Sequence, residues 1–264
     1  MFESFFGCTK TPFDRSLDTK QLFPSDAHQE MIERMVHVAE RRKFGLCTGE
    51  VGAGKSTAAR AVADRLNPIR FTVLYISDSD LSPRNFYHET LNQLGITPRF
   101  YRGDARRQLQ KALLELHESH KTPVVMIDEG HLLSRDMLEE MRFLMNFRMD
   151  SFSPLSLILL GQPELRITLQ TQAYEAIAQR VTLRFHLSGM SETETKCYIL
   201  HHLSVVGVEN AIFTDKALEL IYEFTGGIAR RINNLCTGCM LHACSKSKNL
   251  IDDHTVRVVF ENEF

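Results

Sequence analysis

Five apolar runs of strand length are spaced along the first two thirds of the chain. They cover residues 44–48, 70–76, 123–127, 155–160 and 181–187. The segments between them repeat apolar residues at helical spacing, so strands and helices alternate. Alternation of this kind predicts an α/β fold, in which a parallel five-stranded sheet is flanked by helices.

The strand signals stop after Leu187. Four segments with helical periodicity follow, at residues 191–206, 214–225, 228–245 and 252–261. Ser191, Thr214 and either Asp252 or Asp253 stand where helix N-caps are expected. The pattern predicts an N-terminal linker and first helix over residues 1–43, an α/β core over 44–188, and a small α-helical lid domain over 189–264.

A glycine-rich segment follows the first predicted strand and precedes a helix. It has glycine at its first and sixth places and then Lys55 and Ser56, which is the pattern of a phosphate-binding loop. Glycines allow the backbone N–H groups to point at phosphate oxygens, Lys55 supplies a positive charge, and the Ser56 hydroxyl can bind Mg²⁺. We expect ATP to contact Gly49, Glu50, Val51, Gly52, Ala53, Gly54, Lys55, Ser56 and Thr57.

The third predicted strand ends in two acids, Asp128 and Glu129. Taken alone, it could be a core strand followed by a solvated acidic turn. Together with the loop, it resembles a Walker B motif, in which Asp128 and Ser56 hold Mg²⁺ and Glu129 orients the attacking water.

Composition is that of an ordinary globular chain, with 264 residues, 43% hydrophobic and 24% charged. The chain has no apolar run long enough to span a membrane and does not start like a signal peptide, so we expect a cytoplasmic protein without direct membrane insertion. The six cysteines are expected to be reduced thiols, including Cys236 and Cys239 in a helix core. A net charge of −2 leaves room only for a local basic face.

These motifs, in this order, resemble the AAA+ ATPases, which have a P-loop sheet of the ASCE type and a helical lid. Closer similarity to the ExeA-like branch comes from three segments. They are Phe5-Phe6-Gly7 near the start, Gly161-Gln162-Pro163-Glu164-Leu165, and Gly226-Gly227-Ile228-Ala229-Arg230-Arg231-Ile232-Asn233. Ala229 departs from this pattern, since the branch commonly has proline there. The branch includes secretion-associated ATPases and helper ATPases of DNA transposition of the TnsC and TniB type.

The resemblance implies roles for four side chains. Gln162 matches sensor 1, and Glu129 the residue that activates water. Arg180 matches an arginine finger that reaches the nucleotide of a neighbouring subunit, with Arg184 as the alternative. Arg230 matches sensor 2, although Arg231 beside it leaves an ambiguity of one residue. A trans-acting arginine implies that the chain forms a homo-oligomer with ATP, as a ring or a helical filament.

Residues 97–111 hold the clearest local concentration of basic side chains, with aromatic residues beside them. The segment can meet DNA phosphates or can simply be a solvated helix face. The candidates for contact with double-stranded DNA are Arg99, Arg102, Arg106, Arg107 and Lys111.

Three functions are consistent with these features. The leading hypothesis is an ATP-hydrolysing regulator of DNA transposition that assembles on target DNA and recruits or activates a transposase. The branch resemblance and the short chain favour it. The alternatives are an ATPase that energises assembly of an envelope or secretion complex, and a nucleotide-gated scaffold with weak turnover. An adjacent transposase gene would favour the first, and an envelope operon the second.

Overall fold

The structure is a computed structural model that describes residues 2–14, 16–145 and 152–263. By the density of their contacts, the described residues form two units. We call residues 30–49 and 55–187 the sheet unit, and the described residues of 1–29, 50–54 and 188–264 the helical unit. The predicted boundaries at residues 43 and 188 stay a prediction.

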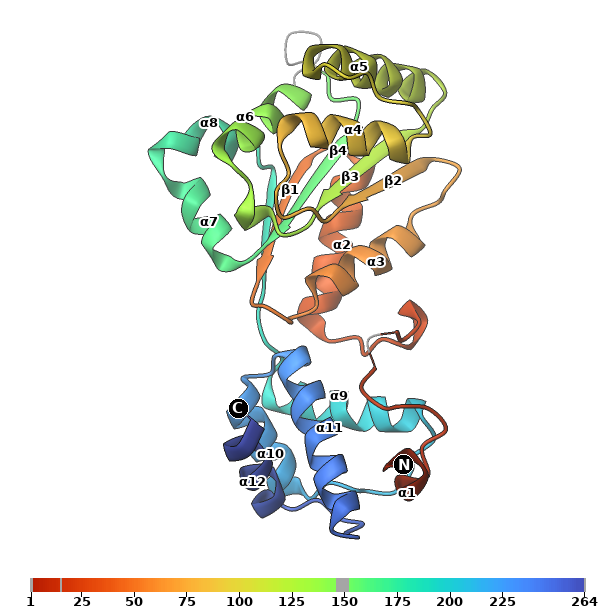
Figure 1. Cartoon of the computed structure of the whole chain (residues 1–264), viewed down its shortest axis with the longest axis vertical. Coiled ribbons are helices and arrows are strands. Elements are labelled where there is room, and N and C mark those ends of the chain that lie inside the picture. The colour runs from red at the N-terminus through yellow and green to blue at the C-terminus, as the bar shows by residue number, and fades with distance from the viewer. Residues whose placement is uncertain (1, 15, 146–151, 264) are drawn as a thin grey trace. The chain divides into compact units, whose positions relative to one another are not determined.

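The sheet unit is built on five parallel strands in the order β2-β3-β4-β1-β5 (Figure 1). The strands are β1 (Phe44–Gly49), β2 (Phe71–Ile76), β3 (Thr122–Ile127), β4 (Ser156–Gly161) and β5 (Leu183–Leu187). The predicted α/β class and five-stranded parallel sheet are thus confirmed. All residues of β1, β3 and β4 are buried, which explains their continuous apolar runs.

Helices cover both faces of this sheet. The helices of the unit are α2 (Asp26–Glu40), which begins before it, α3 (Lys55–Arg65), α4 (Pro83–Gln93), α5 (Arg102–Glu118), α6 (Arg135–Leu144), α7 (Pro163–Gln170) and α8 (Glu175–Ala178). Phe44, Leu157 and Ile127 share a core with side chains from α4 to α8. On the opposite face, Gly45 lies against Val38 of α2, close enough that an added Cβ would be 3.0 Å from the Val38 side chain.

The helical unit has its own core. It contains α1 (Phe2–Phe6), α9 (Glu192–Val205), α10 (Asp215–Thr225), α11 (Ala229–Ser245) and α12 (Asp253–Glu263). The predicted N-caps Ser191, Thr214 and Asp252 each accept a hydrogen bond from a backbone N–H three residues ahead. Cys236 and Cys239 are buried in this core as free thiols.

The topology directs attention to one edge of the sheet. β1 lies between β4 and β5, while the chain runs from β1 to β2 across the sheet, so the order reverses beside β1. In open parallel sheets, ligands bind outside the carboxyl ends of the strands at such a point. The loop after β1, the acids after β3 and Gln162 after β4 all lie at that edge.

Candidate nucleotide-binding site

The glycine-rich loop joins β1 to α3 through a tight turn. The Ala53 N–H donates to the Glu50 carbonyl at 3.2 Å. Gly52 and Gly54 have φ of +82° and +112°, values that side chains with a Cβ rarely adopt. Because α3 begins at Lys55, the N–H groups of its first turn have no acceptor within the helix and point toward its amino-terminal end, which suits an anion. The backbone therefore fits the phosphate cradle expected from the sequence.

Lys55 is buried at the start of α3, with 7% of the residue exposed. Its Nζ donates to the Gly49 carbonyl at 2.7 Å. A buried ammonium group needs oxygen partners, and this bond holds Lys55 over the loop. The same ammonium group can accept phosphate oxygens as further partners.

Three donors converge on the carboxylate of Asp128, which is 3% exposed. The hydroxyls of Ser56 and Tyr75 donate to Oδ2 at 2.6 and 2.5 Å, and the Glu129 N–H donates to Oδ1 at 2.8 Å. A carboxylate and a hydroxyl this close provide oxygen ligands of the kind that Mg²⁺ prefers, so Ser56 and Asp128 fit the metal role predicted for them.

Tyr75 was not anticipated from the sequence. It is the last but one residue of β2, and β2 pairs with β3, so its hydroxyl reaches the carboxyl end of the neighbouring strand. Burial, followed by the hydrogen bond to Asp128, raises the pKa of Tyr75 above its usual range. Tyr75 therefore remains a proton donor to the carboxylate. The only signal in the sequence is a hydroxyl-bearing side chain near the end of a strand.

Glu129 has a left-handed backbone, with φ of +52°, which is uncommon for a residue with a side chain. Its side chain is 47% exposed, and its Oε2 lies 3.5 Å from Nδ1 of His131. The exposed carboxylate is placed to meet a water molecule, and His131 is a neighbour that the sequence did not suggest.

Gln162 directly follows β4 and is the N-cap residue of α7. The register pairs Thr48 of β1 with Gly161 of β4. Gln162 is therefore placed at the same sheet edge as Gly49 and the loop that follows it. Its position fits sensor 1, and its role stays a prediction.

In the helical unit, the start of α11 lies against the phosphate loop. The Arg230 N–H donates to the Gly52 carbonyl at 3.1 Å. A Cβ added to Gly52 would lie 2.4 Å from the Cβ of Arg230. The backbone contact therefore involves Arg230 rather than Arg231. Gly54 also forms a backbone hydrogen bond with the half-buried His28, whose pKa is lowered by burial despite that bond.

Arg180 lies at the opposite edge of the sheet, just before β5. The Thr182 N–H donates to the Phe44 carbonyl at 2.9 Å, which places this segment beside the start of β1. Arg184 lies on β5 itself and donates to the Ala178 carbonyl at 2.6 Å. It lines a different pocket, together with Thr48 and His186.

The five basic residues proposed for DNA contact lie on or beside α5, and acidic partners engage four of them. Arg102 and Arg106 are paired with the buried Glu140, at 2.5 and 3.5 Å. The other two pairs are Arg107 with Asp104 at 2.6 Å and Lys111 with Glu115 at 3.6 Å. Arg99 is exposed in the preceding loop. These pairs reduce the net positive charge of the segment, and contact with DNA stays a prediction.

A protein-family model described as an AAA domain matches residues 37–169, which include the phosphate loop, Asp128 and Gln162. The chain belongs to the AAA+ ATPases. It is also 32% identical to general secretion pathway protein A of Aeromonas hydrophila over 257 residues, or 95% of this chain. That similarity places it in the ExeA-like branch. The matched region is 46% of the relative, so the chain spans less than half of that protein's length.

Solved structures confirm the AAA+ fold. Cdc6p of Pyrobaculum aerophilum has a TM-score of 0.73 at 15% identity, covering 98% of this chain and 70% of that one. ORC2 of Aeropyrum pernix, solved in ADPNP-ADP complexes, has a TM-score of 0.69 at 16% identity, covering 94% and 70%. Membership of the AAA+ family implies ATP and Mg²⁺ as cofactors, and the residues described above fit both. None of the helices in the described ranges combines the length and apolar character needed to cross a membrane.

Proposed function

We propose that this AAA+ ATPase is an ATP-hydrolysing switch that works only when copies of the chain assemble. The observation that carries this proposal is the position of Arg180. β1 has six residues, and at about 3.3 Å per residue its two ends are roughly 20 Å apart. The phosphate loop is at one end and the Arg180 segment at the other. Arg180 therefore acts on the nucleotide of another subunit.

Each candidate residue has a distinct task in this proposal. Lys55 and the loop N–H groups bind the phosphates, while Ser56 and Asp128 hold the metal. Glu129 accepts a proton from the attacking water, and Gln162 orients that water beside it. A Mg²⁺ ion held by Ser56 and Asp128 would supply positive charge to the phosphates. Arg180 from the neighbouring copy adds the remaining positive charge, so assembly and turnover are coupled.

We further propose that the switch acts on double-stranded DNA in the cytoplasm, as a regulator of transposition with a transposase as its partner. The supporting feature is the tip of the segment before α5. Phe100 and Tyr101 are 70% and 71% exposed, and the Arg84 guanidinium lies 4.6 Å from the Phe100 ring centroid. Exposed aromatic side chains among arginines suit contact with nucleic acid. One such tip binds weakly, and an oligomer presents many.

Alternatively, the ATPase acts on an envelope or secretion complex instead of on DNA. This alternative is supported by the 32% identity to general secretion pathway protein A. The similarity covers 95% of this chain, and both proposals use its nucleotide site in the same way. They differ only in what the assembled switch moves or recruits.

DNA binding with and without a non-hydrolysable ATP analogue separates the two. For the DNA role, we expect weak binding without nucleotide and cooperative, salt-sensitive binding with the analogue. Lys55→Ala is the control, since it should lose nucleotide binding and the analogue's effect together. If the analogue-loaded protein has no affinity for duplex DNA at low salt, the DNA role is wrong and the secretion role is favoured.

A mixing experiment tests the assembly switch itself. Arg180→Ala and Lys55→Ala should each be inactive, but a mixture should recover hydrolysis where an intact loop meets an intact arginine. No recovery despite demonstrated co-assembly would count against Arg180 and direct attention to Arg184.

A further inference from the structure

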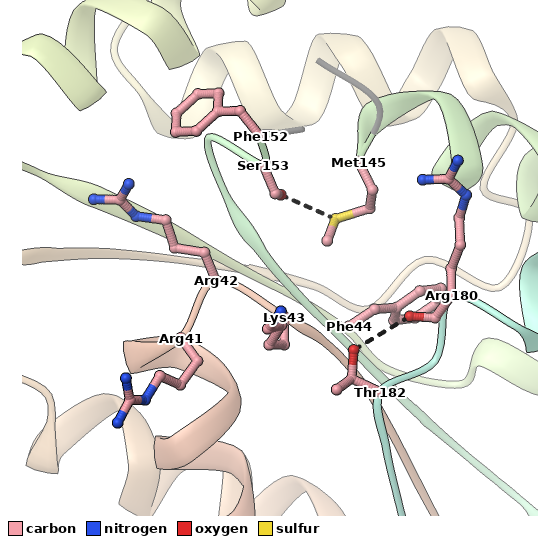
Figure 2. A pocket seen from close by; sticks show the side chains of 9 residues that line it. All are labelled: Arg41, Arg42, Lys43, Phe44, Met145, Phe152, Ser153, Arg180 and Thr182. Atoms are coloured by element: carbon pink, nitrogen blue, oxygen red, sulfur yellow. Dashed lines mark hydrogen bonds between the residues drawn. The ribbon is translucent and has the colours of Figure 1, made fainter. Parts of the chain in front are cut away.

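A basic pocket lies at the amino-terminal edge of the sheet, on the side away from the phosphate loop (Figure 2). Its volume is about 370 Å³. Four of the side chains that line it are cationic, and the described residues around it include no carboxylate. The four cations are Arg41, Arg42, Lys43 and Arg180.

The fold brings these cations together from two distant segments. Residues 41–43 connect α2 to β1, and Arg180 precedes β5, the strand that pairs with β1. Figure 2 shows Arg41 and Arg42 on one side of the pocket and Arg180 on the other, with Lys43 between them. Arg41 and Lys43 are exposed. Long exposed side chains of this kind can turn toward a common anion.

Arg42 occupies an unusual backbone position. It has φ of +51° directly after the end of α2, where glycine is strongly preferred. Its Nε donates at 3.2 Å to the hydroxyl of Thr122, the first residue of β3. A left-handed conformation costs a residue with a side chain about 1 kcal/mol.

We propose that this pocket binds the phosphates of a nucleotide held by a second copy of the chain, with Arg41, Arg42 and Lys43 acting beside Arg180. The inference rests on the proposed assembly switch and extends it from one arginine to a four-cation site. The chain's own nucleotide is at the far end of β1, so it cannot supply these phosphates.

The composition of the pocket suits the phosphates of a nucleotide. Four cations around a volume of about 370 Å³ can donate to the oxygens of a short phosphate chain from several sides. Buried Phe44 is among the lining residues, while Arg41 and Lys43 extend into solvent. Cations beside a bound phosphate stabilise the negative charge that develops on it during transfer.

The test removes two exposed cations and leaves Arg180 and the core intact. The variant is Arg41→Gln with Lys43→Gln. Its control is Lys246→Gln with Lys248→Gln, which removes the same charge from exposed positions after α11. Measurements are ATP affinity, hydrolysis as protein concentration rises, and hydrolysis after mixing with Lys55→Ala subunits.

We expect the pocket variant to bind ATP with unchanged affinity, because its own phosphate loop is distant. Its hydrolysis should fall at least ~10-fold, a cautious figure for removing two cations from a transition-state site. Lys55→Ala subunits retain the basic pocket, so mixing should restore turnover of ATP bound to the pocket variant. The lysine control should hydrolyse ATP like the unmodified protein.

Three outcomes would overturn the inference. Hydrolysis equal to that of the lysine control would show that the cations are not needed, and lost hydrolysis without rescue would show that they act within their own subunit. Lost DNA binding with unchanged hydrolysis would assign the pocket to DNA instead. The mixture of Arg180→Ala with Lys55→Ala distinguishes failure of this inference from failure of the proposed function. If these two variants co-assemble but do not restore hydrolysis, the assembly switch itself is wrong.

Discussion

Replacing Gly52 with alanine should weaken ATP binding, because the added Cβ introduces both backbone strain and a steric clash. Gly52 has φ of +82°, where a side chain costs about 1 kcal/mol. The new Cβ would also lie 2.4 Å from the Cβ of Arg230, and overpacking of this kind costs about 1–3 kcal/mol. The Arg230 Cβ is attached to the helix backbone, so a rotamer change cannot relieve the contact.

The clash is relieved at the lowest free-energy cost if the loop moves away from α11. This movement distorts the phosphate-binding loop. The combined cost is about 2–4 kcal/mol, and it should appear as a loss of roughly 30- to 1000-fold in ATP affinity. Equilibrium titration with a fluorescent ATP analogue measures this loss. Thermal unfolding without nucleotide should change much less, since the loop can move while both cores stay packed.

Gly95→Ala is a matched control. Gly95 has φ of +74°, and a Cβ added there meets nothing within 4 Å. It carries the backbone strain without the steric contact, so it should leave ATP affinity unchanged. Arg230→Gly and Arg230→Ala both lack the guanidinium and differ only in the opposing Cβ, so Gly52→Ala should cost less ATP affinity when added to Arg230→Gly than when added to Arg230→Ala. Equal affinity in the Gly52→Ala and unmodified proteins would refute the proposed contact.

Three further predictions test separate parts of the molecule. Glu129→Gln should bind ATP, form persistent oligomers and hydrolyse ATP poorly in a phosphate-release assay, because Asp128 still holds the metal; near-normal turnover would exclude Glu129 as the base. Tyr75→Phe should lower the free energy of unfolding by about 1 kcal/mol in urea denaturation, the value of a half-exposed hydrogen bond to a carboxylate, and an unchanged midpoint would refute that bond. Burial, then the charge of His201, lowers the pKa of His202 to about 4, so the unfolded state takes up the proton first as the pH falls from 6.5. Stability should therefore be full above pH 6.5 and about 2 kcal/mol lower at pH 5, a loss that His202→Gln should not show if this assignment is correct.

The sequence predicted the sheet and its helices well because their signals are local. Buried parallel strands must be apolar along their whole length, and helix N-caps need an oxygen at one position, as at Ser191 and Thr214. Strand ends moved by only one or two residues, as for β5, which was expected from residue 181 and begins at Leu183. Strand order needs long-range pairing and could not be obtained from these patterns.

The phosphate loop, Asp128 and Glu129 were also accessible from the sequence, since consecutive residues carry that chemistry. Tyr75 was missed because its hydroxyl reaches Asp128 only through the pairing of β2 with β3. His131 lies 3.5 Å from the Glu129 carboxylate, next to the left-handed backbone of Glu129. Residue types alone do not specify that backbone conformation. The pairing of Arg102 and Arg106 with Glu140, 34 or more residues away, was equally hidden.

By itself, the sequence determined that this chain binds ATP on a strand–loop–helix unit, because spacing along the backbone sets which groups can surround a phosphate. Only the tertiary structure decided which charges come close together in space. It paired most of the cations of α5 with acids, and it gathered Arg41, Arg42, Lys43 and Arg180 around one pocket. The physical reason is that Coulomb interactions depend on distance through space, and only the folded chain fixes those distances.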